Sequence, residues 1–160
     1  MNAAHAHLML NHVPVLGLAF GLGLLAFGVW RKNDVLKKTA LTLFVIAAMV
    51  AVPVYLTGEP AEDLAKPLPG VSEAILEQHE ETAVYAFAGM VAVGILALGG
   101  LLRFRAGKLV PASFAWVVLA LSLVVSGVMA WTANLGGQVR HSEIRAGGAQ
   151  FPITSEPNDD

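Results

Sequence analysis

Residues 39–57 read TALTLFVIAAMVAVPVYLT, and this stretch contains no Asp, Glu, Lys or Arg. A helix needs about 20 consecutive, mostly apolar residues to cross the hydrocarbon core of a bilayer. Three further runs have the same character, and they cover residues 12–30, 82–102 and 113–135. The sequence therefore predicts an all-α, integral membrane four-helix bundle in which these four runs are the spans.

The composition of the whole chain agrees with this prediction. Of its 160 residues, 56% are hydrophobic and 14% are charged, whereas a soluble domain has about 25% charged residues. The apolar residues form long runs, which excludes an ordinary soluble enzyme, a coiled coil and a disordered chain. The absence of cysteine excludes disulfides, iron–sulfur clusters and covalently attached c-type haem. The net charge of −2 gives no basic surface for nucleic acid.

The rest of the chain adds one loop and one tail to the bundle. We expect the bundle to comprise residues 1–143, with an outer loop over residues 58–78. Ser72 is a favourable N-cap, so the third helix is expected to begin near it, well before its apolar run. Residues 144–160 contain several Gly and Pro residues and are expected to be extended or disordered.

Glycines recur within the predicted spans. Gly17 and Gly21 are four positions apart in the first span, a spacing that lets helices approach closely. Two interpretations are open for these glycines: simple helix packing, or room for a flat prosthetic group between the helices. The pair Gly136–Gly137 is expected to end the fourth helix as a C-cap.

The distribution of basic residues predicts how the bundle is oriented. Seven of the ten Lys and Arg residues lie in two connections, residues 31–38 and 103–108. Connections rich in Lys and Arg face the cytoplasm. We therefore expect a multi-pass protein of the bacterial inner (cytoplasmic) membrane whose termini and loop 58–78 both face the periplasm.

All five histidines fall on the predicted periplasmic side. They come from three separate segments of the chain and are His5, His7, His12, His79 and His141. Acidic residues accompany them in the segments TGEPAED (57–63), EQHEE (77–81) and RHSE (140–143). This clustering predicts a candidate site at the membrane surface, although histidines at an interface are often only solvated.

One interpretation of the cluster is a haem b site. Two neutral imidazoles from different helices of a bundle can ligate haem iron axially. The natural axial pair is His12 and His79, with His141 as the alternative partner and Arg140 as a cation for the propionates. The participation of His5 and His7 is left open.

A second interpretation is a transition-metal site for Fe, Cu or Zn, because imidazole and carboxylate are ligands for such ions. The candidate ligands are His12, His79, His141, Glu59, Glu62 and Glu80. A third interpretation is a structural network of hydrogen bonds without any cofactor. No catalytic residue is predicted, because the chain has no nucleophile motif such as G-x-S-x-G.

The sequence thus predicts a membrane redox subunit that transfers electrons at the outer face. The alternatives are a non-redox accessory subunit of a larger membrane complex and a metal-handling membrane protein. The expected partners are the lipid bilayer, redox proteins or quinol, and a second copy of the chain. Nucleic acid is not expected as a partner.

Four blocks of the sequence carry a resemblance to a known group. They are HLMLNHVP (7–14), TGEPAE (57–62), HEE (79–81) and GGQVRHSE (136–143). In this order they resemble uncharacterised bacterial four-span membrane proteins. The chain is more distantly similar to a predicted haem-binding four-helix membrane domain family, whose first helix opens with His-Pro or His-Phe-Pro. Some members of that family are fused to Rieske or cytochrome modules, so the resemblance implies a redox setting and haem b. This chain departs from that pattern in Asn11-His12-Val13-Pro14 and in its acidic middle loop, which leaves open a metal ion in place of haem.

Overall fold

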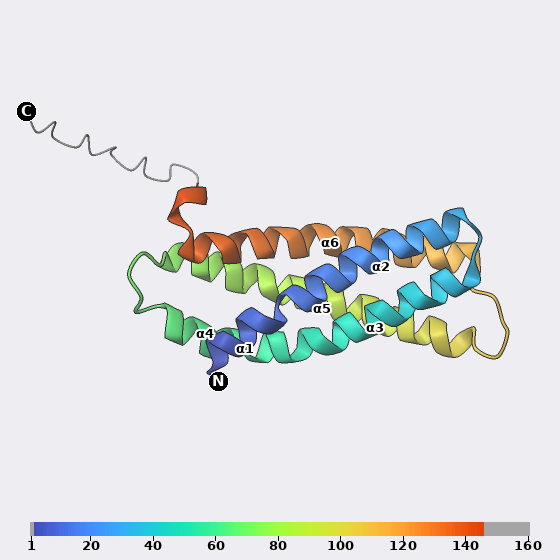
Figure 1. Cartoon of the computed structure of the whole chain (residues 1–160), viewed down its shortest axis with the longest axis horizontal. Coiled ribbons are helices and arrows are strands. Elements are labelled where there is room, and N and C mark those ends of the chain that lie inside the picture. Colours follow the sequence, from blue (N-terminus) through green and yellow to red (C-terminus); the bar gives the residue numbers. More distant parts are fainter. Residues whose placement is uncertain (1, 146–160) are drawn as a thin grey trace, which may run out of the picture.

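The computed structural model of the chain describes residues 2–145, which form helices joined by short connections (Figure 1). The helices are α1 (Ala3–Leu10), α2 (His12–Trp30), α3 (Asp34–Leu56), α4 (Gly58–Ala65), α5 (Glu73–Arg103) and α6 (Ala112–Arg140), followed by the 3-10 helix η1 (Ser142–Ile144). Four helical stretches are long and apolar enough to cross a bilayer: Ala3–Trp30, Asp34–Leu56, Glu73–Arg103 and Ala112–Arg140. The chain is a multi-pass membrane protein, and the predicted four-helix bundle is confirmed.

The four long helices form a closed ring of neighbours. Helix α2 packs on α3, α3 on α5, α5 on α6, and α6 packs back on α2. The short helices α1 and α4 lie against each other at the end of the bundle where the described chain both begins and ends (Figure 1). Fully buried side chains fill the centre of the ring, among them Leu18, Phe44, Met90 and Val118.

Most glycines of the spans make room for side chains of neighbouring helices. A Cβ atom at Gly21 would lie 2.5 Å from the Phe44 ring, and one at Gly100 would lie 2.5 Å from the Phe114 ring. A Cβ atom at Gly89 would lie 2.8 Å from Val125. These contacts support the helix-packing interpretation, because protein side chains already occupy the space that each missing side chain leaves.

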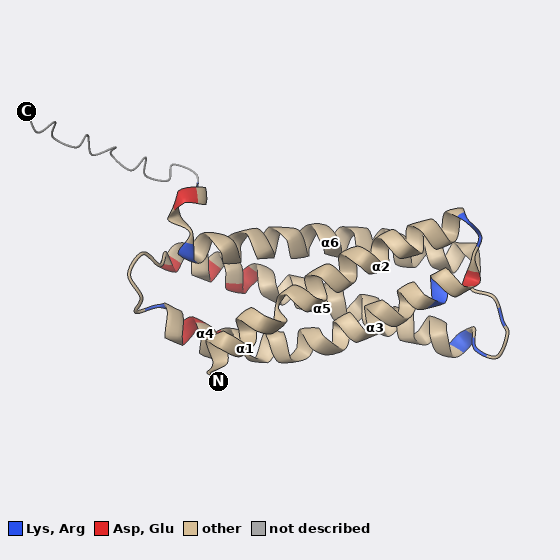
Figure 2. Ribbon diagram, viewed as in Figure 1, with Lys and Arg blue, Asp and Glu red and all other residues tan. Residues whose placement is uncertain are grey.

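The charged residues separate to the two ends of the bundle, as Figure 2 shows. At the basic end, Asp34 joins the start of α3 to the connection between α5 and α6. Its carboxylate accepts a hydrogen bond of 2.7 Å from the Val110 backbone N–H and lies 2.8 Å from Lys38 Nζ. The neighbouring Lys37 is buried and donates its ammonium proton to the Val110 carbonyl. Asp34 therefore holds two segments together that are 76 residues apart in sequence.

Helices α5 and α6 are longer than a bilayer requires. They contain 31 and 29 residues, or about 46 and 43 Å at 1.5 Å per residue, against about 30 Å of hydrocarbon. The polar first turns of α5, which begin after the predicted N-cap Ser72, and the last turns of α6 lie at the same end of the bundle (Figure 1). Together with α1 and α4 they form a helical cap on that end.

Three local predictions differ from the structure. The predicted loop 58–78 contains α4 and the first turns of α5. The prediction that Gly136–Gly137 ends the fourth helix is wrong, because α6 continues to Arg140. The predicted tail begins with ordered residues, since Ile144 belongs to η1 and Arg145 donates hydrogen bonds to backbone carbonyls. The rest of that tail, residues 146–160, lies outside the described residues.

Candidate functional site

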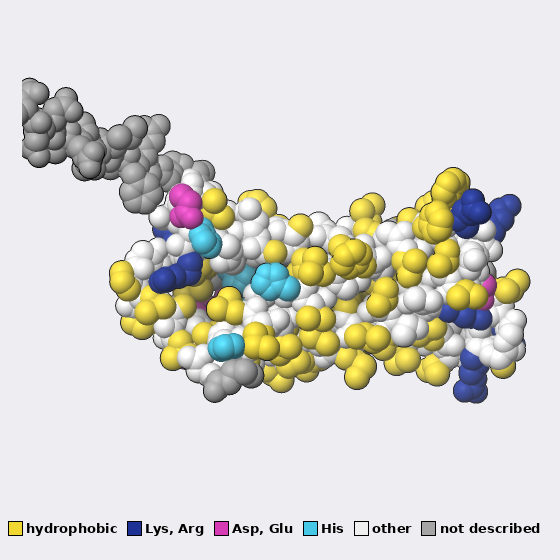
Figure 3. Space-filling view, viewed as in Figure 1, with side chains coloured by type: hydrophobic (Ala, Val, Ile, Leu, Met, Phe, Trp, Pro, Cys, Tyr) yellow, Lys and Arg dark blue, Asp and Glu magenta, His cyan; other side chains and the backbone are white. Residues whose placement is uncertain are grey.

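We use the term histidine end for the end of the bundle that carries α1, α4, residues 73–81 of α5 and residues 133–145. Every histidine of the chain lies in or next to these segments. In the face seen in Figure 3, the histidine side chains gather at this end, while the opposite end carries Lys and Arg. The predicted clustering of histidines therefore holds in three dimensions, and the question is which of them face one another.

His79 is held between α5 and α6. Its Nδ1 atom lies 2.9 Å from the backbone carbonyl oxygen of Thr132 on α6, and the side chain is half-buried. The ring packs on Gly136, where a Cβ atom would lie only 2.9 Å from His79 Cε1. Gly136 thus serves a different purpose from the predicted one: it makes room for the His79 imidazole within a continuing helix.

His79 also occupies the predicted face of its helix. Ala86 and Met90, which share that face, are both buried in the core. Residues spaced by three or four positions lie one above the other on a helix. The helical period therefore directs the His79 side chain inward, toward α6, as expected.

His7 is held in a matching way between α1 and the junction of α3 and α4. Its Nδ1 atom lies 3.0 Å from the carbonyl oxygen of Val54 and 3.5 Å from Thr57 Oγ1. Val54 is in the last turn of α3, where carbonyl groups lack their full set of helical partners. The His7 ring is half-buried and also lies beside a glycine, since a Cβ atom at Gly58 would be 3.8 Å from His7 Cε1.

The two hydrogen bonds fix how the imidazoles present their other nitrogen. A carbonyl oxygen only accepts, so Nδ1 of His7 and Nδ1 of His79 must each carry the proton. The Nε2 atom of each neutral ring then holds a lone pair. This is the tautomer of a histidine that ligates a metal through Nε2 while a carbonyl orients its other nitrogen.

Two further observations concern side chains on and beside α1. His7 and His79 lie within electrostatic range of each other, although they come from different helices. Asn11, at the junction of α1 and α2, has a buried side-chain oxygen with no hydrogen-bond partner among the described residues. Buried polar atoms are nearly always paired with protein, water or a ligand. The histidine end therefore has an unsatisfied acceptor as well as two available imidazole nitrogens.

The structure places the other predicted histidine ligands elsewhere. His12 is exposed, and its Nδ1 atom lies 3.3 Å from the Leu8 carbonyl oxygen of the preceding turn. His141 is exposed, and its Nδ1 atom lies 2.8 Å from the Glu143 carboxylate. Within residues 2–145, no three His, Asp or Glu side chains form a group that could hold a metal ion. The six predicted metal ligands are thus not brought together in this arrangement.

The predicted acidic ligands form a separate charged group on α4 and α5. Glu62 lies 2.7 Å from Lys66 Nζ, and this hydrogen bond raises the pKa of Lys66 above its ordinary value. Glu80 of α5 lies against Glu62, and Glu59 is near enough to act on Glu80 electrostatically. These carboxylates are therefore tied to Lys66 and to one another.

The two arginines near the end of α6 differ in their use. Arg145 donates hydrogen bonds to the carbonyls of Gln138, Val139 and Gly70, so it closes the end of α6 and holds the connection that precedes α5. Arg140 makes one long hydrogen bond, 3.5 Å to the Pro69 carbonyl, and its side chain is exposed. Of the two, Arg140 is the one whose guanidinium is available to an anion.

Sequence reasoning singled out His79 and left the participation of His7 open. The helical period from His12 predicts that His5 shares its face and that His7 does not, and this pattern alone gives no contact for His7. The partner of His7 lies in the last turn of α3, 47 positions away in sequence. Only the fold of α1 back onto that turn reveals the contact.

Comparisons of the chain with protein-family models, curated proteins and solved structures found no match. The resemblance carried by the four sequence blocks therefore stays a prediction. The function of the chain has to be inferred from the geometry of the histidine end.

Proposed function

We propose that this chain is a redox subunit of the bacterial inner membrane that binds haem b at the histidine end and transfers electrons there. In this proposal the histidine end and both termini face the periplasm, in keeping with the positive-inside distribution of Lys and Arg. His79 and His7 would hold the haem iron through Nε2, in place of the pair His12 and His79 that the sequence favours.

One observation carries the proposal. Two imidazoles on different helices each have Nδ1 within 3.0 Å of a backbone carbonyl oxygen, which leaves both Nε2 atoms available. Haem iron takes two axial ligands from the protein in this kind of bundle site. A transition-metal ion held by side chains alone needs three or more, and residues 2–145 gather no such group.

Other residues of the histidine end are compatible with a haem group. Gly136 makes room for the His79 imidazole itself, and Gly58 lies in ordinary contact with the His7 imidazole. Arg140 offers an exposed guanidinium for a propionate carboxylate. When bound, haem b supplies a one-electron couple at this face, while the carbonyls of Val54 and Thr132 orient the two imidazoles. Redox proteins or quinol are the expected electron partners.

A second candidate function is a non-redox accessory subunit. One observation favours it: the same hydrogen bonds already join α1 to α3 and α5 to α6 without any further group. In that case the two histidines act only as cross-links of the cap. A metal-handling role stays a third alternative, with a metal ion in place of haem.

The test is a reduced-minus-oxidised visible spectrum of the full chain, purified in detergent from haem-supplied cells. The proposal expects a Soret band with sharp α and β bands, lost in His79→Ala and His7→Ala and retained in the control His141→Ala. A flat spectrum from protein with native helix content would overturn it. Elemental analysis of the same sample then separates the metal-handling role from the accessory role.

A further inference from the structure

The face of α1 that points away from the bundle, continued by the first residue of α2, carries three side chains with metal-ligating atoms. His5, Met9 and His12 are separated by four and three positions. At about 100° per residue, this spacing places all three on one stripe of a helix. The stripe persists past the end of α1, because Asn11 has helical dihedral angles (φ −60°, ψ −28°) and donates its backbone N–H to the His7 carbonyl over 2.9 Å.

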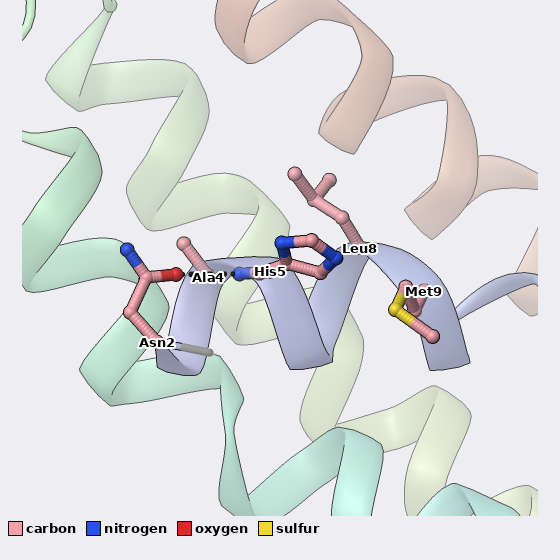
Figure 4. A pocket seen from close by; sticks show the side chains of 5 residues that line it. All are labelled: Asn2, Ala4, His5, Leu8 and Met9. Atoms are coloured by element: carbon pink, nitrogen blue, oxygen red, sulfur yellow. Dashed lines mark hydrogen bonds between the residues drawn. The ribbon is translucent and has the colours of Figure 1, made fainter.

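The ligating atoms on this stripe are accessible. His5 is exposed, and 58% of the Met9 surface is exposed. A shallow pocket lies between them, lined by Asn2, Ala4, His5, Leu8 and Met9. Figure 4 shows the His5 ring and the Met9 thioether on the same side of the α1 ribbon, one turn apart.

His12 is the last residue of the stripe and lies on the C-terminal side of Met9. Its Nδ1 donates to the Leu8 carbonyl, which leans the ring back toward the turn that contains Met9 and leaves Nε2 with the lone pair. Residues three or four positions apart on a helix have Cβ atoms about 5–6 Å apart. Met9 is therefore within bridging distance of both His5 and His12.

The chemistry of the stripe selects one class of ion. The sequence of α1, AAHAHLML, contains no Asp or Glu, so it offers no oxygen ligands for a hard cation. Thioether sulfur is a soft ligand that selects Cu(I), and imidazole also suits copper. Zinc prefers a four-coordinate site of thiolate, imidazole and carboxylate ligands, and this face supplies two imidazoles but no thiolate or carboxylate.

We propose that α1 is a capture site for Cu(I), with the thioether of Met9 and the imidazole of His5 as ligands and His12 as the third. The site is distinct from the proposed haem site, because His7 turns its ring toward α3 while His5, Met9 and His12 form the opposite stripe. It is also independent of the sidedness of the bundle. Helix α1 would thus carry His7 on one side and the proposed Cu(I) ligands His5 and Met9 on the other.

The test is a competition for Cu(I) between the full-length, detergent-solubilised protein and the chromophoric chelator bicinchoninate, without oxygen. Cu(I) is supplied as its acetonitrile complex. We expect one Cu(I) per chain, and we expect Met9→Leu and His5→Ala each to weaken binding at least tenfold. The matched control is Met49→Leu, because Met49 on α3 is a 68% exposed methionine with no histidine on its stripe. This control should bind like the parent protein.

Met9→Leu keeps the apolar surface of α1 and removes only the sulfur, so a change in Cu(I) affinity with unchanged helix content reports ligation. Equal affinity of the Met9→Leu variant and the parent would overturn the proposal, as would equal loss in the Met49→Leu control. The outcome is separable from that of the haem proposal. Met9→Leu should leave the visible spectrum intact, and His79→Ala should leave Cu(I) affinity intact.

Discussion

The His79 imidazole rests on Gly136, so closely that a Cβ atom there would lie 2.9 Å from His79 Cε1. The contact joins α5 to α6 at the point where His79 donates to the Thr132 carbonyl. A residue within α6 thus determines where a histidine of α5 can lie, and this dependence can be tested.

We expect Gly136→Ala to destabilise the protein by about 1–3 kcal/mol, because the methyl group overpacks against the ring and displaces it from Thr132. Gly127→Ala is the matched control on the same helix, since no atom lies within 4 Å of its added Cβ. Alanine is the better helix former, so the control should be more stable by up to about 1 kcal/mol. Thermal unfolding in detergent measures both. Destabilisation of the same size in the two variants would contradict the contact.

His7→Ala should loosen α1 without unfolding the bundle. The substitution removes the hydrogen bond to Val54, and one such bond is worth about 0.5–1.5 kcal/mol. Amide hydrogens of residues 3–10 should therefore exchange several-fold faster, whereas those in the centre of α5 should not change. His5→Ala is the control, because His5 is exposed on the opposite side of the helix. Mass spectrometry of exchanged peptides gives the result, and unchanged exchange in His7→Ala would refute the anchoring role.

Asp34→Ala should be the most damaging substitution at the basic end. It removes the acceptor of the Val110 N–H and leaves the ammonium groups of Lys37 and Lys38 without their carboxylate. The expected loss is about 1–3 kcal/mol of unfolding free energy. Asp34→Asn keeps an acceptor oxygen for Val110 and should lose less. Chemical denaturation in detergent distinguishes the two, and equal losses would mean that the ion pairs carry the whole effect.

Glu143 should titrate below the usual range of a glutamate. Its own backbone N–H and the ring of His141 lower the pKa of the Glu143 carboxyl. Because the pKa is lower in the folded state, the favourable contact is present at neutral pH and is lost as the pH falls through the folded-state pKa. Carboxyl ¹³C shifts measured by NMR report the titration directly. His141→Ala should move the midpoint upward, and an unmoved midpoint would assign the effect to the backbone alone.

The spans were predictable because each one is decided locally. A run such as residues 39–57 has no charged residue, and burial in lipid makes a helix the only way for a single segment to satisfy its own backbone. The face of His79 was predictable for the same reason, since the helical period relates it to Ala86 and Met90.

The pairing of histidines was not predictable from local sequence. His7 bonds to a carbonyl 47 positions away, and no residue near His7 indicates that contact. The role of Gly136 was not predictable from local sequence either. A glycine near the end of an apolar run is typical of a C-cap, and only the position of His79 on another helix shows that here it makes room for an imidazole.

The closed ring of α2, α3, α5 and α6 has a practical consequence for anyone who modifies this protein. With an even number of crossings, residues 2 and 145 emerge at the same pole as His7 and His79 (Figure 1). A reporter or redox-active domain joined directly before residue 2 or directly after residue 145 would therefore begin its fold beside the candidate site. A domain inserted within the connection 104–111 would instead be separated from that site by the full length of the bundle.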